Sequence, residues 1–442
     1  MKMFWGCQIP AQLAFIELAT RRVLDALGVP YSDLENTTCC PEKLAMAEKD
    51  KFHYQLTAAR NLALAEKTGH DILVVCNGCY ATLKTMSEDL RVDVALRSRV
   101  NERLGRVGLE VRGKARVRHL AELIVSDLGL PLLARKVKRP LAGMKIAVHY
   151  GCNLLRPHEA LAHDDPLNPT SLDELVKALG GVSVYYGTKM DCCGGNYSMV
   201  NGQEQSERML AHKLAGVRAA GAAALIVPCP ACFTQFDVRQ EKLLRGLEAE
   251  QIPVLHVSEL LYFALGLEEN ETMVKRHRIS VQNFLERWSQ RAEAARQVAT
   301  RFDAKLLSAC AACGACREDC PVAAALESFN PNEIIEKVAE GRIAEVLEEA
   351  EFWNCLDCMT CYEMCPQRFG MNTVFNKLKE IATAEGRLPQ TLAALQKSFY
   401  ETGALAAASR GLRKRLGLPD PADPGIADLK KVLGEDRDEG EK

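Results

Sequence analysis

The sequence has no long apolar stretch. Nowhere in its 442 residues do about 18 uncharged apolar residues follow one another, which is the length that a membrane-spanning helix needs. The first ten residues carry one lysine and no apolar core, so they do not have the pattern of a signal peptide. We therefore expect no transmembrane helix and a cytoplasmic location.

The sequence also lacks an excess of charge. Its net charge is −2, which gives no electrostatic reason to expect binding to nucleic acid or to an anionic membrane surface. A glycine-rich dinucleotide fingerprint is absent as well, because Gly78 and the Gly194–Gly195 pair belong to cysteine motifs. Any flavin or nicotinamide must then reside on a partner protein.

No cysteine stands outside a spaced motif. The chain has 18 cysteines, and a cytoplasmic protein keeps its thiols reduced, so disulfides are not expected. A scattered cysteine is usually a small buried apolar residue, but that explanation does not account for regular spacing. Hydrophobic content of 48% and charged content of 26% are ordinary for a globular protein of several domains. The cysteines therefore indicate metal chemistry.

Two sets of five cysteines follow the same order, a single cysteine, an adjacent pair and a C-x-x-C motif. The gaps are 31 and 35 residues in the first set, and 39 and 35 residues in the second. The glycines after the second pair would let the backbone approach a bulky inorganic group closely. The first set consists of Cys7, Cys39, Cys40, Cys76 and Cys79, and the second consists of Cys152, Cys192, Cys193, Cys229 and Cys232.

The segments around the two sets also correspond. Apolar runs of strand length at 71–75, 145–150, 182–186 and 224–227 lead toward cysteines, and helical patterns cover 12–27 and 42–68. Strands that deliver side chains at their carboxyl ends are typical of open α/β sheets. We therefore predict a duplication, with a first α/β lobe over 1–140 and a second over 141–267.

Two motifs of the form C-x2-C-x2-C-x3-C-P occur in the last part of the chain. Three thiolates at this spacing bind one [4Fe-4S] cube, and the fourth, before proline, binds the other cube. Zinc is not favoured, since zinc ribbons supply their ligands in two pairs. The spacing predicts two cubane clusters, one held by Cys310, Cys313, Cys316 and Cys365, and the other by Cys355, Cys358, Cys361 and Cys320.

The remaining segments complete the predicted organisation. Residues 268–307 are charged and helical in pattern, so we expect a helical linker that is exposed to solvent. A mainly α-helical ferredoxin-like domain over 308–416 would carry the two cubane clusters. Residues 417–442 contain three prolines and a charged end, which is typical of a tail that contacts a partner or stays disordered.

Both five-cysteine sets match the motif of the CCG domain. Residues 1–265 resemble the B subunit of heterodisulfide reductase, and residues 308–425 resemble its C subunit, so the chain is similar to the two fused in that order. The resemblance implies that each CCG set holds a noncubane [4Fe-4S] cluster through its five cysteines. Pro41 stands where the motif expects glycine, which bears on the local geometry of the first set. Zinc, or a purely structural lobe, is the alternative at one CCG site.

The resemblance implies an iron–sulfur oxidoreductase within a soluble complex. Electrons would enter the cubane clusters from a flavin- and iron–sulfur-containing partner of the A-subunit type, and the noncubane clusters would reduce a disulfide or a related acceptor. Such modules occur in electron-bifurcating complexes of anaerobes, where hydrogenase or formate dehydrogenase subunits are further partners. The alternative is a protein that only relays electrons to or from a partner dehydrogenase or reductase, for example beside a benzoyl-CoA reductase.

The sequence does not identify a proton donor. A lone histidine near the end of a strand is more often structural than catalytic. His119 and His256 occupy matching positions in the two repeats, which favours a structural role for both. The candidates close to the predicted ligands in sequence are His53, His149, His158, His163 and Lys189.

Overall fold

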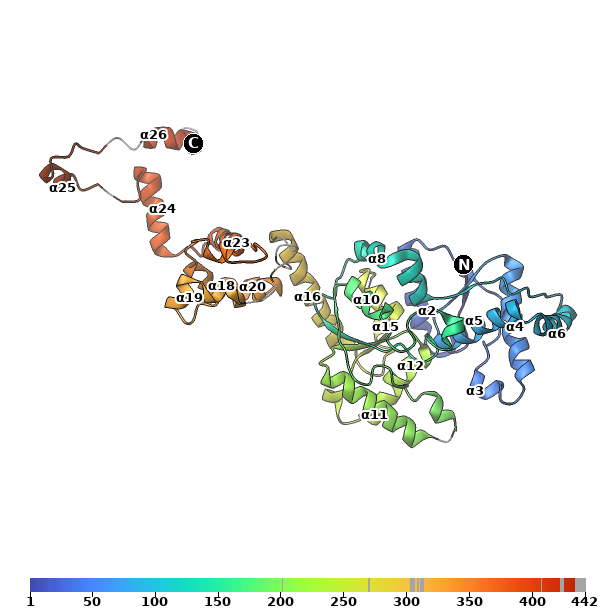
Figure 1. Cartoon of the computed structure of the whole chain (residues 1–442). Helices are drawn as coiled ribbons and strands as arrows, with labels where there is room; N and C mark the ends of the chain where they lie inside the picture. Colours follow the sequence, from blue (N-terminus) through green and yellow to red (C-terminus); the bar gives the residue numbers. More distant parts are fainter. Residues whose placement is uncertain are drawn as a thin grey trace. The chain divides into compact units, whose positions relative to one another are not determined.

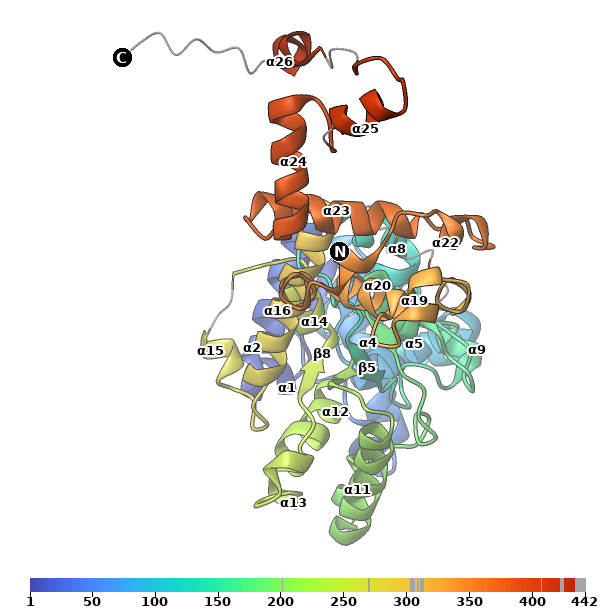
Figure 2. The same ribbon diagram turned by 90° about the vertical axis from the view of Figure 1, so that its left-hand side faces the viewer.

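The computed structural model describes residues 1–200, 202–268, 271–302, 307, 310, 314–406, 408–421 and 425–433. The chain divides into two compact units, Met1–Ala295 (unit 1) and Arg296–Lys442 (unit 2). The ribbon is drawn from two directions (Figure 1, Figure 2). The predicted ligand Cys313 and the last residues of the expected tail, from 434 on, lie outside the described residues.

The described part of unit 1 contains two parallel sheets of four strands each. Their strand orders are β2-β1-β3-β4 and β6-β5-β7-β8, so the second sheet repeats the topology of the first. The first sheet contains β1 (Lys2–Phe4), β2 (Ser32–Asp33), β3 (Ile72–Val74) and β4 (Val117–His119). The second contains β5 (Lys145–Val148), β6 (Val182–Ser183), β7 (Ala224–Val227) and β8 (Val254–His256). The predicted duplication of an α/β lobe is confirmed by this topology.

The strands form where β-branched and other apolar residues run together. In β3 and β7 every residue is buried, as expected for the central strands of parallel sheets covered on both faces. The edge strand β6 is shorter than the expected run at 182–186, because only Val182 and Ser183 pair with β5. Each central strand ends at a cysteine motif, which places both five-cysteine sets at carboxyl edges.

The first lobe is completed by helices that pack around its sheet. The predicted helices at 12–27 and 42–68 end where expected, at Gly28 and Gly69, both of which take the left-handed conformation that terminates helices. The helix predicted at 42–68 is interrupted, because Asp50 caps a new helix by accepting a hydrogen bond from His53 N. The helices are α1 (Gln8–Gln12), α2 (Ala14–Leu27), α3 (Lys43–Met46), α4 (Lys51–Thr68), α5 (Asn77–Val92), α6 (Val94–Leu104), 3-10 helix η1 (Gly105–Val107), α7 (Leu120–Glu122), π-helix η2 (Leu123–Gly129) and α8 (Leu130–Lys136).

The second lobe packs against the first through reciprocal helix contacts. Helix α14 packs against α2, and α10 packs against η2 and α8, so an early helix of each lobe contacts helices near the C-terminal end of the other. The helices are α9 (His158–Leu161), α10 (Ser171–Ala178), 3-10 helix η3 (Asn196–Val200), α11 (Gln203–Ala219), α12 (Pro230–Thr234), π-helix η4 (Gln235–Arg239), α13 (Gln240–Leu243), 3-10 helix η5 (Glu248–Glu250), α14 (Val257–Ala264) and α15 (Glu271–Val274). Both lobes share one continuous apolar core.

Helix α16 (Gln282–Arg301) differs from the exposed linker that we expected. Phe284 and Trp288 are fully buried in the core of unit 1. The Trp288 indole donates a hydrogen bond to the carbonyl of Pro140, and the Arg139 guanidinium stacks over its ring at 5.1 Å. The expectation of exposure was wrong for this part of the helix because its few large apolar residues lie on one face, which the surrounding charges obscure in the sequence.

Unit 2 is helical in its described residues. Its core contains Phe329, Phe352, Phe375 and Leu378, and six cysteines of the ferredoxin motifs pack against this core: Cys310, Cys316, Cys320, Cys355, Cys361 and Cys365. The helices are α18 (Ala315–Glu318), α19 (Pro321–Ala325), α20 (Pro331–Ala339), α21 (Ile343–Glu349), 3-10 helix η6 (Glu351–Asn354), α22 (Thr360–Glu363), α23 (Met371–Ala384), α24 (Gln390–Thr402), α25 (Arg410–Arg415) and α26 (Ile426–Leu433). A search of the described helices of both units finds none that is long and apolar enough to cross a bilayer.

Candidate metal centres

The first set of cysteines gathers at the carboxyl edge of the first sheet. Cys7 follows β1, and Cys76 follows β3 and immediately precedes α5. The Sγ atoms of Cys39 and Cys7 lie 3.4 Å apart. Cys40 is hydrogen-bonded to Cys39 and Cys79, and Cys79 is hydrogen-bonded to Cys76. The five thiols, which come from three separate segments, thus form one connected group.

The second set repeats this arrangement in the second lobe. The Sγ atoms of Cys232 and Cys193 lie 3.7 Å apart. Cys192 is hydrogen-bonded to Cys152 and Cys193, and Cys232 to Cys229. No disulfide joins any of the 17 cysteines that the structure describes.

The contacts among the thiols favour thiolate formation at one member of each pair of adjacent cysteines. A hydrogen bond from Cys39 holds the pKa of Cys40 well below its usual range. In the second set, a hydrogen bond from Cys152 does the same for the pKa of Cys192. Since thiolates, and not thiols, bind metals, two groups of five mutually contacting sulfurs fit iron–sulfur clusters chemically.

The two sets differ in the backbone donors that face their sulfurs. The amides of Gly194 and Gly195 donate to the Sγ atoms of Cys192 and Cys193, each at 3.4 Å. Pro41 occupies the position of Gly194 in the first set and has no N–H to donate. The departure from the CCG motif therefore removes a hydrogen bond to a sulfur.

The two sets touch at the interface between the lobes. Cys76 of the first set is hydrogen-bonded to Cys229 of the second, and this contact raises the pKa of the Cys76 thiol. Asn77, directly after Cys76, donates to the carbonyl of Tyr150 at 2.8 Å. Clusters held by the two sets would therefore be neighbours, with the first cysteine of each C-x-x-C motif between them.

Two histidines hold the lobes in this alignment. His119 Nε2 donates to the carbonyl of Pro228 at 3.2 Å, and His256 Nε2 donates to the carbonyl of Val75 at 3.2 Å. Each acceptor immediately precedes the C-x-x-C motif of the opposite lobe. In both histidines Nδ1 accepts a backbone N–H of the helix that follows, which fixes the proton on Nε2. The structural role expected for both residues is confirmed.

A cavity of about 660 Å³ opens onto the first set. All five cysteines of that set line it, and from the second set Cys229 does so. Gly195, Arg156 and Arg239 also line it. A small molecule in this cavity would reach the sulfurs of the first set and lie within range of two cations.

A buried lysine supports the second set, and the sequence analysis did not identify it. Lys213 donates to the carbonyls of Thr188, Lys189 and Asp191 at 2.6, 2.8 and 2.8 Å. Burial lowers the pKa of its ammonium to about 8. The three bonds fasten the loop that leads into Cys192. Nothing in its sequence context, a helix of alternating polar and apolar residues, distinguishes this lysine from an exposed one.

The other candidate proton donors occupy varied positions. His53 is exposed and pairs with Asp50, and His158 is exposed. His163 is mostly buried and contacts Ser171 Oγ at 3.3 Å. Lys189 is paired with Asp173 at 2.6 Å. His149 differs from all of these, because it is buried beside the sulfurs of Cys193 and Cys232.

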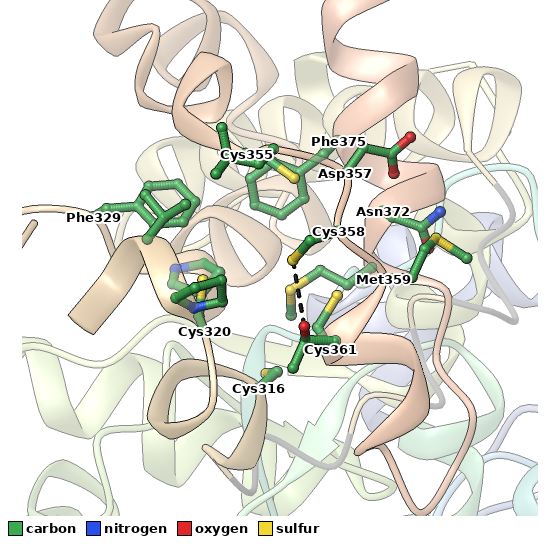
Figure 3. Close-up of a pocket in the computed structure, with 16 residues that line it drawn as sticks. Cys316, Cys320, Phe329, Cys355, Asp357, Cys358, Met359, Cys361, Asn372 and Phe375 are labelled. Atoms are coloured by element: carbon green, nitrogen blue, oxygen red, sulfur yellow. Dashed lines mark hydrogen bonds between the residues drawn. The ribbon is translucent and has the colours of Figure 1, made fainter. Parts of the chain in front are cut away.

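In unit 2 the described ferredoxin cysteines gather in two places. A small cavity of about 30 Å³ is lined by Cys316, Cys320, Cys355, Cys358 and Cys361. Figure 3 shows these side chains around one space. The Sγ atom of Cys358 lies 3.4 Å from Thr360 Oγ1. Cys320 thus lies with the cysteines of the other motif, as the crossed assignment predicts for a ligand.

The second gathering lies around a cavity of about 70 Å³. Cys310, Cys316 and Cys365 line it, together with Cys361. The Phe369 amide donates to Cys365 Sγ at 3.3 Å. Here Cys365, from the second motif, lies with cysteines of the first. Cys316 and Cys361 line both cavities, so each group contains cysteines of both motifs, and the assignment of each cysteine to one cluster stays a prediction. Cys313 lies outside the described residues.

Comparison with known protein families gives two matches. The cysteine-rich CCG domain matches residues 1–84 and 146–237, one segment in each lobe. The 4Fe-4S dicluster domain matches residues 306–369. The two domain types coincide with the two kinds of cysteine motif.

Three relatives illustrate the range of similar proteins. The B subunit of the ferredoxin/F420H2-dependent CoB-CoM heterodisulfide reductase of Methanosarcina acetivorans is 37% identical over 64% of this chain and 95% of its own length. The 8-methylmenaquinol:fumarate reductase membrane anchor subunit of Wolinella succinogenes is 31% identical over 61% of this chain and 93% of its length. A protein of Archaeoglobus profundus that resembles the heterodisulfide reductase C subunit is 29% identical over 31% of this chain and 77% of its length.

These matches agree with the repeated lobes, the two five-cysteine sets and the paired ferredoxin motifs. The chain has the domain content of a B subunit followed by a C-like segment, and its function is iron–sulfur electron transfer of the heterodisulfide reductase type. The chain belongs to the family of the heterodisulfide reductase B subunit, and it carries a 4Fe-4S dicluster domain related to the C subunit in the same polypeptide.

Proposed function

We propose that this chain reduces a disulfide, or a related acceptor, at the cavity beside the first cysteine set. The observation that supports this proposal is that all five cysteines of that set line a cavity of about 660 Å³. A protein that only relays electrons needs its centres close to one another, but it needs no cavity open to their sulfurs. Arg156 and Arg239 would bind anionic groups of the acceptor and orient its sulfur–sulfur bond.

The proposal assigns one cluster to each cysteine group. Bound clusters supply single electrons, and two neighbouring centres can together meet the balance of RSSR′ + 2e⁻ + 2H⁺ → RSH + R′SH. The five cysteines of each CCG set would hold a noncubane [4Fe-4S] cluster. In unit 2, Cys310, Cys313, Cys316 and Cys365 would hold one cubane cluster, and Cys355, Cys358, Cys361 and Cys320 the other.

A partner must supply the electrons in this scheme. We expect a flavin- and iron–sulfur-containing protein of the A-subunit type to reduce the cubane clusters, and electron bifurcation would take place on that flavin. Hydrogenase or formate dehydrogenase subunits would be further members of the complex. The lobes at 1–140 and 141–267 would carry the chemistry, and the segment 308–416 the entry of electrons.

A relay between other redox proteins is the second candidate function. It is favoured by the 31% identity to the Wolinella succinogenes protein, whose name assigns it to a fumarate reductase and not to disulfide reduction. In that case the cavity would have no acceptor, and a partner dehydrogenase or reductase would exchange electrons with the CCG lobes.

Metal analysis after anaerobic purification tests the cluster assignment. Two cubane and two noncubane clusters of four irons each give about 16 irons per chain. About 12 irons with one zinc would identify one CCG lobe as a zinc or structural site, and about 8 irons with zinc would refute both noncubane clusters.

A substitution at the cavity then separates reductase from relay. Gly195 lines the cavity, and a Cβ there would lie 3.4 Å from Cys193 Sγ. In Gly195→Leu, we expect disulfide-dependent turnover to fall while iron content and reduction by artificial dyes persist, since the larger side chain fills space beside the sulfurs. Gly187→Leu is the control, because a Cβ at Gly187 meets nothing within 4 Å. Unchanged turnover in Gly195→Leu would favour the relay. Paramagnetic spectra of the CCG sites that no added disulfide or thiol changes would also favour it.

A further inference from the structure

His149 is a buried side chain whose polar atoms have no protein partner. Only 1% of its surface is exposed, and neither ring nitrogen makes a hydrogen bond within the described part of the chain. The ring packs edge-to-face against Phe236, with centroids 4.9 Å apart, which limits its rotation. A buried polar group without a partner costs about 1–3 kcal/mol, so such groups usually face something that the protein chain does not supply.

The neighbours of this ring are sulfurs of the second set. One nitrogen of His149 and the Sγ atoms of Cys193 and Cys232 all lie within 4.8 Å of one another. The two Sγ atoms are 3.7 Å apart. Two thiolates bound to one metal at about 2.3 Å in tetrahedral geometry would be separated by about 3.8 Å. The ring therefore borders the position at which these two sulfurs would share a metal.

The first lobe has no such side chain. The offset of 145 residues that relates Cys7 to Cys152 relates Phe4 to His149. The sheets agree, because Phe4 pairs with Val74 at the end of β1, and His149 follows Val148 at the end of β5. Phe4 is also buried, but its ring has no N–H. The same lobe has Pro41 in place of Gly194, so at these two positions the second lobe has an N–H group where the first has none.

We propose that His149 donates an N–H hydrogen bond to a sulfur of the centre held by the second set, and that this centre consequently has the higher reduction potential of the two. An imidazole has at least one N–H in either protonation state. Hydrogen bonds to cluster sulfurs stabilise the reduced form, which carries more negative charge, and so raise the potential. The inference depends on the proposed iron–sulfur centre at the second set, but not on the identity of the acceptor.

The test is a redox titration of the full-length protein, purified anaerobically and followed by electron paramagnetic resonance. Replacing His149 with Phe gives the second lobe the side chain of the first, and we expect one of the two CCG-site potentials to shift downward while the other stays unchanged. His149→Gln keeps an N–H donor, so its shift should be smaller. Pro41→Gly supplies the missing amide in the first lobe and should raise the other potential. His158→Phe is the control, because His158 is close in sequence but exposed.

Pulsed electron paramagnetic resonance on protein labelled with 15N-histidine tests directly whether His149 contacts the second centre. We expect a weak nitrogen coupling to the second centre that disappears in His149→Phe, even if that variant binds less iron. A strong nitrogen coupling, of the kind that a directly bound histidine gives, would show that His149 is an iron ligand and not a hydrogen-bond donor, and would overturn the proposal. Unchanged potentials in His149→Phe at full iron content would also overturn it. Absence of iron from the second set of the unsubstituted protein would instead contradict the proposed function.

Discussion

At the scale of single residues, each five-cysteine set depends on the glycine before its first cysteine. Gly6 and Gly151 both have left-handed backbones, with φ of +70° and +74°. A Cβ at Gly6 would lie 2.9 Å from Cys79 Sγ, and a Cβ at Gly151 would lie 3.5 Å from Cys232 Sγ. Both glycines therefore leave space beside the last cysteine of the C-x-x-C motif, where a cluster would need it.

The substitution Gly6→Ala tests this need for space. We expect a loss of stability of about 1–3 kcal/mol from crowding, together with a loss of the iron bound by the first set, because Cys79 must move. Gly28→Ala is a matched control, since Gly28 has φ +76° but a Cβ there meets nothing within 4 Å. That control should lose only about 1–2 kcal/mol from backbone strain and keep its iron. Thermal unfolding and iron content per chain are the measurements, and equal iron loss in both variants would argue against crowding.

At the scale of elements, the two lobes are joined by a pair of equivalent histidine contacts. His119 and His256 are the N-cap residues of α7 and α14, and both are fully buried. Glu122 and Glu259 accept the backbone N–H of His119 and His256, respectively. Because Nδ1 of each ring accepts a backbone N–H, protonation of that nitrogen would break the contact at the start of each helix. The starts of α7 and α14, which position the two interface histidines, are therefore sensitive to acid.

Burial lowers the pKa of His119 to about 3, and it lowers the pKa of His256 as well. Between about pH 6.5 and pH 3 the unfolded chain then binds more protons than the folded one. The stability that His119 contributes is complete above about pH 6.5 and decreases as the pH falls, by at most about 1.4 kcal/mol per pH unit. Unfolding in urea at several pH values should show this slope.

The variant His119→Gln keeps a donor near Pro228 but does not titrate, so its stability should change less between pH 6.5 and pH 5. The titration of His277 does not mask the pH dependence of stability expected from His119. Although burial opposes it, the Glu259 carboxylate raises the pKa of His277, so the stability it contributes is lost only above about pH 6.5. An identical pH slope in the variant and the unsubstituted protein would contradict the assignment to His119.

The elements that the sequence predicts best are those determined by local patterns. The strand that ends at Cys76 and the helix ends at Gly28 and Gly69 follow from apolar runs and glycines next to them. The break before Asp50 was missed, because a cap competes with a continuous helical pattern. The contact of Cys76 with Cys229 could not be predicted, since it arises from packing between the two lobes. The burial of His149 could not be predicted either, since it arises from packing against Phe236, Cys193 and Cys232, which lie far from it in sequence.

At the scale of the whole molecule, the chain combines two kinds of cysteine site in separate compact units. Unit 1 carries the two CCG sets, and unit 2 carries the ferredoxin motifs. Figure 3 shows that Cys320 lies with Cys355, Cys358 and Cys361, although 34 residues (321–354) separate it from the nearest of them. The proposed crossed ligation would place two cubane clusters close together, because each motif would contribute to both. This closeness is what a route for electrons into unit 1 requires.

The substitution Cys320→Ser tests that route. It removes the fourth sulfur beside Cys355, Cys358 and Cys361, so the cluster held there should be damaged, with the iron content falling by up to about four per chain. Turnover with the proposed flavoprotein donor should collapse, because electrons would then lack one step between that donor and the CCG sites. Artificial dyes that reduce the CCG sites directly should still support turnover. The neighbouring exposed residue provides the control, since Asp319→Asn alters no sulfur and should leave both activities intact. If dye-driven and donor-driven turnover disappear together in a folded Cys320→Ser protein, electrons do not enter through unit 2, and the ferredoxin motifs serve the CCG lobes in some other way.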